Sequence, residues 1–390
     1  MAKVAIIGAG AGGFACTAYL THFGHEVILY NRRPETIEPI KKYGGIEVIG
    51  NDGTSVVGTR EILGFIKFDN LTTDIKEALE FADIVLNPVP AFAHEYYAKL
   101  CAPYVKDDQA FVIMGKGGGA LTYAKIFKEQ GVNKRVYLGE TNTLPFGVTK
   151  LGPLGGLPHQ IRIEAPVNRF IVSAFPAKDT DHVFDIMKEL FPTRELRRGK
   201  NVMETILVDY NAITHPPPMI CNIARIESGD GSFHLFGRDA LTPAVVNLVE
   251  AIDRERIALS EALGIKAHPI EEEVYIVGWN PVYGVYAKGR EDKVLPIYEA
   301  LHTEYLEICE GPFNIKSRHL TEDVPYGLVT FSSIGDMIGV DTPVCDALVT
   351  IASVLLKEDF WKIGRTVEKL GINPKWSKEE LERFLTEGKV

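Results

Sequence analysis

Residues 3–13 read KVAIIGAGAGG, and this stretch decides the fold of the first half of the chain. A short apolar run typical of a buried strand leads directly into the pattern GxGxxG, with Gly8, Gly10 and Gly13 at its fixed positions. The apolar residues that follow predict a helix over residues 12–23. A strand, a glycine turn and a helix in this order predict a Rossmann domain, whose helix N-terminus binds the diphosphate of a dinucleotide. The loop residues expected to contact that cofactor are Gly8, Gly10, Ala11, Gly12 and Gly13.

The residues after the next expected strand, EVILY at 26–30, indicate which nicotinamide cofactor is preferred. An NAD-specific protein usually has Asp or Glu at this point, which accepts hydrogen bonds from the ribose 2′-hydroxyl. This chain has Asn31, Arg32 and Arg33 instead. Two guanidinium groups can bind a 2′-phosphate through paired hydrogen bonds, whereas a carboxylate would repel it. We therefore expect NADP (NADPH), with NAD as the alternative if the arginines only form a solvated turn before Pro34.

Further strands are expected around residues 82–90, 109–119 and 135–147, in alternation with helices. The carboxyl ends of parallel strands border the ligand crevice of an open sheet. The residues expected near cofactor or substrate for this reason are Pro88, Pro90, Lys116 to Gly119, and the run Glu140, Thr141, Asn142 and Thr143. Two strand-like runs within residues 158–175, HQIRIEA and RFIVSAF, are expected to complete the same sheet. The first domain is therefore expected to span residues 1–195.

Residues 196–390 show long helical periods, which predict an all-α second domain. The clearest helices are expected at residues 238–264, a segment that ends in glycine, and at residues 343–371, which begin with proline. Ser377, three residues before Glu380, predicts the N-cap of a terminal amphipathic helix. The expected fold is an α/β Rossmann-type amino-terminal domain followed by an all-α carboxy-terminal domain.

The composition argues against several classes of partner. A formal net charge of −10 gives no reason to expect a basic face for nucleic acid, so small metabolites are the expected ligands. Glycines interrupt the apolar run between Val4 and Leu20, so neither a signal peptide nor a membrane span is expected. The five cysteines are scattered and form no CxxC pair, which predicts reduced thiols, a cytoplasmic location and no metal site. A homodimer through the apolar helices is a further hypothesis.

Three residues of the second half have side chains suited to proton transfer and carboxylate binding. Residues 211–218 read NAITHPPP, so His215 lies where a helix is expected to stop before three prolines. Residues 317–328 read SRHLTEDVPYGL, an irregular stretch that contains Arg318 and Asp323. An aspartate bonded to one ring nitrogen of the histidine would fix its tautomer and leave the other nitrogen for proton transfer. An arginine beside them would bind a carboxylate through two parallel hydrogen bonds.

With these motifs the chain resembles the opine dehydrogenases, the octopine and nopaline dehydrogenase family, over nearly its whole length. The matching pieces are GAGAGG at residues 8–13, PAFAH at 90–94, ETNTLPFG at 140–147, NAITHP at 211–216, and Arg318 followed by DVPYGL at 323–328. The resemblance implies a Rossmann domain, a helical domain and an NAD(P)H-dependent oxidoreductase. It implies that the substrates are an amino acid and a 2-oxo acid such as pyruvate. They would form an imine with loss of water, and a hydride from the nicotinamide would then reduce the imine carbon.

The resemblance also implies a role for each candidate side chain. By the resemblance His215 is the general acid and base, Asp323 orients it, and Arg318 holds a carboxylate. Glu140 and Thr141 match a substrate-side motif of the family, where the carboxylate would hold the incoming ammonium group or a basic side chain of the substrate. A free imidazole has a pKa of about 6.5, so it can give and retake a proton at neutral pH.

Two other functions stay open at this point. The chain departs from the family pattern at Lys116, where several relatives have an uncharged polar residue or arginine, and this leaves substrate choice open. Glycerol-3-phosphate dehydrogenases have a catalytic lysine in a similar Lys-Gly turn, so a ketone reductase of that kind, or of the ketopantoate reductase kind, is the main rival. It would leave NAITHP and DVPYGL unexplained. A non-catalytic NADP-binding sensor is the second alternative, and the joint presence of His215, Arg318 and Asp323 argues against it.

Overall fold

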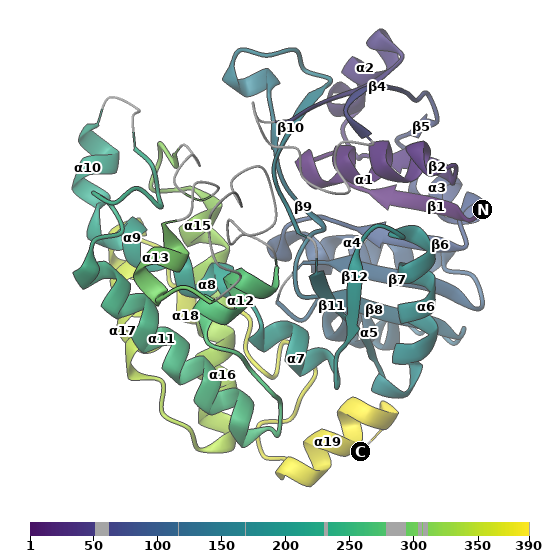
Figure 1. The fold of residues 1–390 in the computed structure, drawn as a ribbon. Helices are drawn as coiled ribbons and strands as arrows, with labels where there is room; N and C mark the ends of the chain where they lie inside the picture. Colours follow the sequence, from purple (N-terminus) through teal and green to yellow (C-terminus); the bar gives the residue numbers. More distant parts are fainter. Residues whose placement is uncertain are drawn as a thin grey trace.

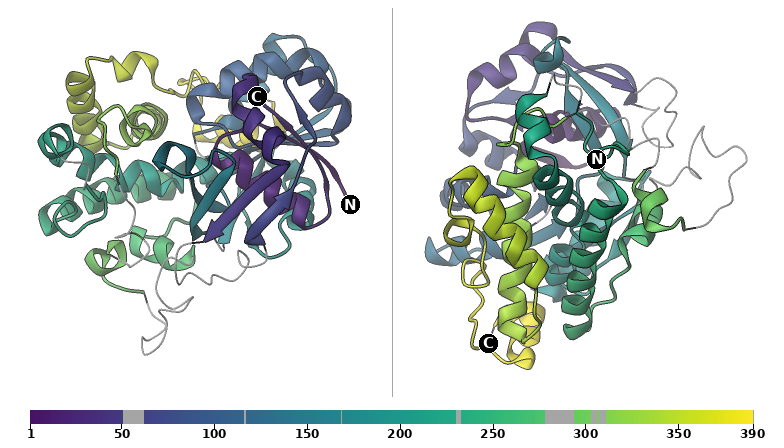
Figure 2. Two further views of the ribbon diagram at one scale, coloured as in Figure 1. Left: turned by 90° about the horizontal axis from the view of Figure 1, so that it is seen from above. Right: turned by 90° about the vertical axis from the view of Figure 1, so that its left-hand side faces the viewer.

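The structure of the protein is a computed structural model, which describes residues 1–50, 62–115, 117–167, 169–229, 233–277, 294–302, 306 and 311–389. A half that contains the β-sheets and a half built of helices lie side by side (Figure 1, Figure 2). This arrangement confirms the expected α/β amino-terminal domain and all-α carboxy-terminal domain.

Within the described residues the main sheet has eight strands, and its centre is parallel. From edge to edge these strands are β12 (Glu195–Arg198), β11 (Arg169–Phe175), β8 (Val136–Thr141), β7 (Gln109–Met114), β6 (Ile84–Asn87), β1 (Lys3–Ile7), β2 (Glu26–Tyr30) and β5 (Leu71–Thr72). Neighbouring strands are parallel except β11 and β8. The chain order reverses at β1, so the loop after β1 opens into the crevice at which such sheets bind ligands.

A smaller sheet lies beside the main one, and the sequence did not predict it. Its strands, in order, are β4 (Gly64–Lys67), β3 (Gly45–Gly50), β10 (Gln160–Pro166) and β9 (Phe146–Lys150). The expectation that both runs within residues 158–175 complete the main sheet is therefore wrong for β10 and correct for β11. β10 pairs in parallel with β3, a strand more than a hundred residues earlier. An apolar alternating run predicts a strand but does not identify a partner so distant in the chain.

Helices pack against the sheets of the first half. These are α1 (Ala11–His22), α2 (Pro34–Tyr43), α3 (Ile75–Phe81), η2 (Ala91–Ala93), α4 (His94–Cys101), η3 (Ala102–Tyr104), α5 (Gly119–Glu129), η4 (Gly152–Leu154), η5 (Ala177–Asp179) and α6 (Thr180–Leu190). Helix α1 packs on β2 and on β9, and so bridges the two sheets. The core strand β1 is closed off from solvent, since the residues from Val4 to Ile7 have no exposed surface.

The second half is helical throughout its described residues. Its helices are α7 (Val202–Leu207), α8 (Tyr210–Thr214), α9 (Pro216–Cys221), α10 (Ile223–Ser228), α11 (Pro243–Ala262), α12 (Ile270–Ile276), α13 (Ile297–Leu301), α15 (Arg318–Thr321), the π-helical turn η7 (Val324–Leu328), α16 (Val329–Ile338), α17 (Pro343–Leu356), α18 (Phe360–Ile363) and α19 (Lys378–Glu387). α11, α16 and α17 pack on one another. The expected helix at residues 238–264 begins later, at Pro243 after the N-cap Thr242. The expected helix at 343–371 is interrupted at Lys357, which has a φ of +54°.

The last helix returns to the first half (Figure 1). α19 begins with the predicted capping box of Ser377 and Glu380. Its Phe384 ring lies 4.8 Å, centroid to centroid, from the ring of Phe175 in β11. The expected domain boundary at residue 195 falls on the first residue of β12, so the main sheet extends to Arg198.

The described part of the chain contains no helix with both the length and the apolar character that crossing a membrane requires. Among the described cysteines, Cys16, Cys101 and Cys345 are buried free thiols and Cys221 is exposed. Cys309 lies outside the described residues.

Candidate active site

The glycine loop after β1 has the geometry that a dinucleotide diphosphate requires. Gly8 has a φ of +100°, in the left-handed region that glycine adopts readily. A Cβ on Gly13 would lie 1.8 Å from the Gly8 carbonyl oxygen, so only glycine lets α1 pack this closely on the turn. Around the Cβ position of Gly10, no described atom other than its chain neighbours lies within 4 Å. This open space at the N-terminus of α1 suits an anion, so the loop residues fit a bound dinucleotide.

A hollow of about 370 Å³ lies beyond the glycine loop, and Arg32 and Arg33 line it. Asn31 ties these arginines to the loop, because its Oδ1 accepts a hydrogen bond from the Ala9 N–H at 3.1 Å and its Nδ2 donates to the Arg33 carbonyl at 3.0 Å. The Arg32 guanidinium lies 5.1 Å from the centre of the Tyr96 ring. Both arginines are exposed, so a phosphate could approach them from solvent. The hollow therefore has the chemistry expected for the adenosine end of the cofactor.

A second cavity, of about 250 Å³, lies where the two halves meet. Gly10, Val89 and Pro90 line both cavities, so the two cavities adjoin at the glycine loop, and we refer to them together as the groove. Ala11, Gly12 and Pro88 line the second cavity as well. Its lining from the second half consists of Asp209, Tyr210, Asn211, His215, Arg318, His319, Glu322 and Asp323. We call this second cavity the cleft. A ligand that fills the groove would contact both halves.

His215 lies at the junction of two short helices. Helix α8 ends at Thr214, and α9 begins at Pro216, where a proline needs no hydrogen bond from a backbone N–H. The prediction that a helix stops at the histidine is correct. The prolines do not form a loop, however, because they supply the first turn of the next helix. The α8 helix is itself fixed by Asp209, whose carboxylate accepts hydrogen bonds from the Asn211 and Ala212 N–H groups.

The structure brings His215 and Asp323 together across 108 positions of the sequence. The Nδ1 of His215 lies 2.6 Å from Oδ2 of Asp323. The Asp323 side chain is 3% exposed and that of His215 is 15% exposed, so the pair is shielded but the ring still reaches the cleft. A carboxylate can only accept this hydrogen bond, so the proton sits on Nδ1, and Nε2 is the ring nitrogen that can take up or release a proton.

His319 and Glu322 are among the residues that line the cleft. The sequence interpretation did not single them out. The ring centroids of His319 and His215 are 4.4 Å apart with an interplanar angle of 74°, and His319 Nδ1 lies 2.7 Å from the Ser317 Oγ. Glu322 follows Arg318 by four residues, and its N–H donates to the Arg318 carbonyl. Residues three or four positions apart lie on the same side of a helix. A helix over this segment therefore places Glu322 on the same side as Arg318 and His319, and the sequence pattern could have identified Glu322.

Glu140 was expected at the substrate, but its side chain does not line the cleft. The carboxylate is buried, and it accepts hydrogen bonds from the N–H groups of Gly118 at 3.1 Å and Ala120 at 2.8 Å, at the start of α5. The Thr205 hydroxyl of the second half donates to it at 3.3 Å. Burial raises the pKa of Glu140 to about 7, and these hydrogen bonds act in the opposite direction. Glu140 therefore joins the sheet to α7 and does not face the groove.

Thr141 is also behind the cleft wall. Its hydroxyl accepts a hydrogen bond from the Gly115 N–H at 3.2 Å and donates to the Thr143 carbonyl at 2.7 Å. The next residues, Asn142 and Thr143, line the cleft in its place. Lys116, another sequence-predicted contact, lies outside the described residues.

Comparison with known proteins identifies the family. Residues 198–356 match the family described as NAD/NADP octopine/nopaline dehydrogenase, alpha-helical domain. Residues 4–155 match the ketopantoate reductase PanE/ApbA family. The chain is 32% identical to an opine dehydrogenase of Arthrobacter sp. (strain 1C), over 95% of this chain and 95% of that protein. The chain belongs to the opine dehydrogenase family.

Solved structures of octopine dehydrogenase share the fold of this family member. One, in complex with NADH and agmatine, aligns with a TM-score of 0.77 at 20% identity and covers 100% of this chain and 99% of that chain. Another, with NADH and pyruvate, aligns with a TM-score of 0.73 at 19% identity over 100% and 99% of the two chains. At these identities the likeness shows the fold, so the roles of side chains must be argued from the geometry of this chain.

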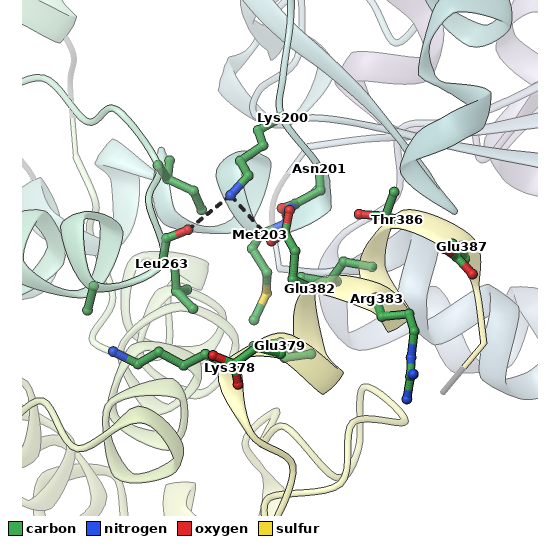
Figure 3. A pocket seen from close by; sticks show the side chains of 14 residues that line it. Lys200, Asn201, Met203, Leu263, Lys378, Glu379, Glu382, Arg383, Thr386 and Glu387 are labelled. Atoms are coloured by element: carbon green, nitrogen blue, oxygen red, sulfur yellow. Dashed lines mark hydrogen bonds and ion pairs between the residues drawn. The ribbon is translucent and has the colours of Figure 1, made fainter.

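This opine dehydrogenase family member has a wider hollow, of about 650 Å³, away from the groove (Figure 3). It lies where α19 passes the start of α7 and the end of α11. The Lys200 ammonium lies 3.2 Å from the Leu263 carbonyl oxygen and 3.3 Å from a carboxylate oxygen of Glu382. The described residues that line this hollow are not shared with the groove. Although this hollow is larger, none of the described candidate site residues lines it, so we do not assign it as the active site.

Proposed function

We propose that this chain joins an amino acid to a 2-oxo acid in an NAD(P)H-dependent reductive condensation. The amine and the ketone lose one water to form an imine, and a hydride and a proton then convert the imine into a secondary amine. The product is an N-(1-carboxyalkyl) amino acid, an opine. One observation carries the proposal: the 2.6 Å hydrogen bond between His215 and Asp323 at the wall of a groove that continues to the glycine loop.

In this reaction His215 is the general acid and base. The attacking amine must lose a proton, and the hydroxyl of the carbinolamine must gain one before it leaves as water. Nε2 of His215 can carry out both transfers, because Asp323 holds the proton on Nδ1 and so fixes the tautomer. A histidine in this role typically contributes about a hundredfold to ten-thousandfold to the rate.

Arg318 is the proposed carboxylate ligand. It is exposed at the cleft and lies beside His319, on the same segment as Asp323. Both substrates carry a carboxylate, and a guanidinium group can bind its two oxygens at once. A 2-oxo acid held in this way, such as the pyruvate named for one octopine dehydrogenase structure, would place its ketone carbon next to the imidazole.

NAD(P)H, bound along the groove, supplies the hydride. We propose NADPH as the preferred form, because Arg32 and Arg33 line the adenosine end and the first residue after β2 is Asn31, not an acid. NADH stays the alternative, since it is the cofactor named for the octopine dehydrogenase structures of similar fold. The cytoplasmic location and the homodimer stay predictions.

The proposal can be tested by following the absorbance band of reduced nicotinamide in a panel of amino acids crossed with 2-oxo acids, with NADPH and NADH in parallel. We expect oxidation only when both substrates are present, and a product whose mass equals the two substrates minus one oxygen atom. Each substrate alone is the control. Binding of NADPH without oxidation in any pair would instead support the sensor.

A ketone reductase is the second candidate, because residues 4–155 match the ketopantoate reductase family. In such an enzyme Lys116 would donate the proton, and no amine would be needed. This candidate gives no role to the hydrogen bond between His215 and Asp323. Oxidation of NADPH with a ketone alone, abolished by Lys116→Met and retained in His215→Ala, would favour it over the condensation.

A further inference from the structure

Two charged side chains of the second half hold the backbone of one residue of the first half, Ala91, through the two peptide groups that flank its Cα. The Ala91 N–H donates to Oε1 of Glu322 at 2.8 Å, and Nη2 of Arg365 donates to the Ala91 carbonyl oxygen at 2.8 Å. These residues are 231 and 274 positions from Ala91 in the sequence. Ala91 directly follows Pro90, which lines both cavities of the groove. The groove wall is therefore held by the opposite half of the molecule.

Arg365 reaches a second loop of the sheet as well. Its Nη1 donates to the carbonyl oxygen of Gly117, in the loop after β7, whereas Ala91 lies in the loop after β6. The guanidinium thus bridges the carboxyl ends of two adjacent strands, which is the edge at which such sheets bind ligands. The Tyr326 ring, whose centre lies 4.8 Å away, orients the guanidinium, and the backbone N–H of Arg365 donates to the Pro325 carbonyl.

Both side chains are buried, Arg365 to 3% exposure and Glu322 to 5%. Burying a charge is unfavourable unless hydrogen bonds replace the lost water, and an apolar contact would join two domains at a lower cost. The charges here are directed at the backbone of one residue, the anion at the Ala91 N–H and the cation at the Ala91 carbonyl oxygen. Such an arrangement fixes the relative position of the loops more closely than an apolar contact could.

The same segment carries the groups proposed for catalysis. Glu322 is the residue before Asp323, and Asp323 is hydrogen-bonded to His215. The Tyr326 N–H donates to the Glu322 carbonyl at 2.9 Å, so the segment is a continuous helical turn. A shift of Glu322 relative to Ala91 would therefore also shift Asp323 and the imidazole relative to the groove. Rates fall steeply with such errors, since a misplacement of about 1 Å can cost about a hundredfold.

We propose that Glu322 and Arg365 are positioning residues, which clamp the backbone of Ala91 and thereby set the imidazole of His215 at reacting distance from a substrate bound at the nicotinamide end of the groove. The proposal rests on the proposed function. It differs from a role for Glu322 in binding the substrate ammonium group, which would act on substrate affinity. The clamp acts on the rate of the chemical step after both substrates are bound.

The test compares Glu322→Ala with Glu322→Gln in the full-length enzyme. Glutamine keeps an oxygen that can accept from the Ala91 N–H, and alanine does not. We expect Glu322→Ala to lower kcat by about tenfold to a hundredfold and to raise the deuterium isotope effect measured with 4-deuterated NADPH, as hydride transfer becomes slower. KM for both substrates should change by less than about threefold, and Glu322→Gln should recover most of kcat.

Arg365→Lys is the second test variant, because one ammonium group cannot replace a guanidinium group that donates to two carbonyl oxygens. It should lower kcat in the same way, and the double variant Glu322→Ala with Arg365→Lys should lose less than the product of the two effects, since both residues hold the backbone of Ala91. Glu368→Ala is the matched control, because this exposed carboxylate lies three residues from Arg365. It should leave kcat and the isotope effect unchanged.

Hydrogen exchange at residues 90–93 reports on the clamp without any need for activity. Protection there should fall in Glu322→Ala and return in Glu322→Gln. Lost protection with an unchanged kcat would overturn the positioning role, and so would a large rise in KM for the amino acid with kcat unchanged. If the wild-type enzyme oxidises no NADPH in any substrate pair, the proposed function fails. In that case, unchanged protection in Glu322→Ala would overturn the clamp as well.

Discussion

The two halves of the molecule present their functional groups in different ways. The first half offers mainly backbone, in a loop from Gly8 to Gly13 that depends on left-handed φ and on the absence of Cβ atoms. The second half offers side chains, and its central pair, His215 and Asp323, meets across 108 positions. The first arrangement depends on local conformation. The second exists only when α8, α15 and η7 have packed against one another.

By the proposed function, this difference separates binding from chemistry. Loop residues and Arg32 line the part of the groove proposed for the cofactor, whereas His215 and Arg318 line the cleft that the second half completes. If the separation holds, substitutions in the second half should change turnover at constant cofactor affinity. Substitutions at the adenosine end should change cofactor affinity at constant turnover.

The largest effect is expected for His215→Ala. We expect kcat to fall by about a hundredfold or more, because the variant lacks the proposed proton donor to the departing hydroxyl. The NADPH dissociation constant, measured from cofactor fluorescence, should stay the same, since the imidazole acts on substrate. His22→Ala removes an exposed histidine and serves as the control. A loss confined to NADPH affinity would mean that His215 acts on the cofactor, and it would contradict the separation of cofactor binding from chemistry.

A smaller loss of turnover is expected for Asp323→Asn. The imidazole remains, but the amide no longer supplies a buried negative charge and no longer enforces the proton on Nδ1. We expect kcat to fall by roughly tenfold to a hundredfold, with NADPH affinity unchanged. Steady-state kinetics for both substrates would check this. A decrease equal to that of His215→Ala would show that the pair acts as one unit, and no decrease at all would remove Asp323 from the mechanism.

The same contrast explains what the sequence could predict. The glycine loop was predicted residue by residue, because each role follows from local backbone sterics. The partnership of His215 with Asp323 was predicted through family resemblance, since no local rule joins residues so far apart. The wall of the cleft was predicted only in part: within the expected run 140–143, Asn142 and Thr143 line it, whereas Glu140 and Thr141 do not. Successive side chains of a strand point to opposite faces of the sheet, so an error of one residue in where the strand ends changes which side chains face the cleft. The strand pattern in the sequence does not fix that last residue. The small sheet was missed because β10 pairs with the distant β3.

An effect on affinity alone is expected for the double variant Arg32→Ala with Arg33→Ala. Hydrogen bonds to charged groups contribute about 1.5–3 kcal/mol when buried, and these exposed arginines should lie at the low end. The NADPH dissociation constant should therefore rise by roughly tenfold, with little change for NADH and in kcat. Titrations with both cofactors would check it. Equal weakening of the two would mean that the arginines do not select the 2′-phosphate.

The smallest effect on turnover is expected for Glu140→Gln, at the seam between the halves. The pKa of Glu140 is raised by burial from 4.5 to about 7, so the folded state favours the protonated form. Stabilisation from that form is complete below about pH 4.5 and is lost as the pH rises through about 7. Glutamine stays neutral, so the free energy of unfolding of the variant relative to wild type should improve over this interval, by up to about 3 kcal/mol, and then level off. Denaturant unfolding at a series of pH values measures this difference. A difference that stays flat would mean that the carboxylate is charged throughout, held by the Gly118 and Ala120 N–H groups, and that burial does not dominate at this seam.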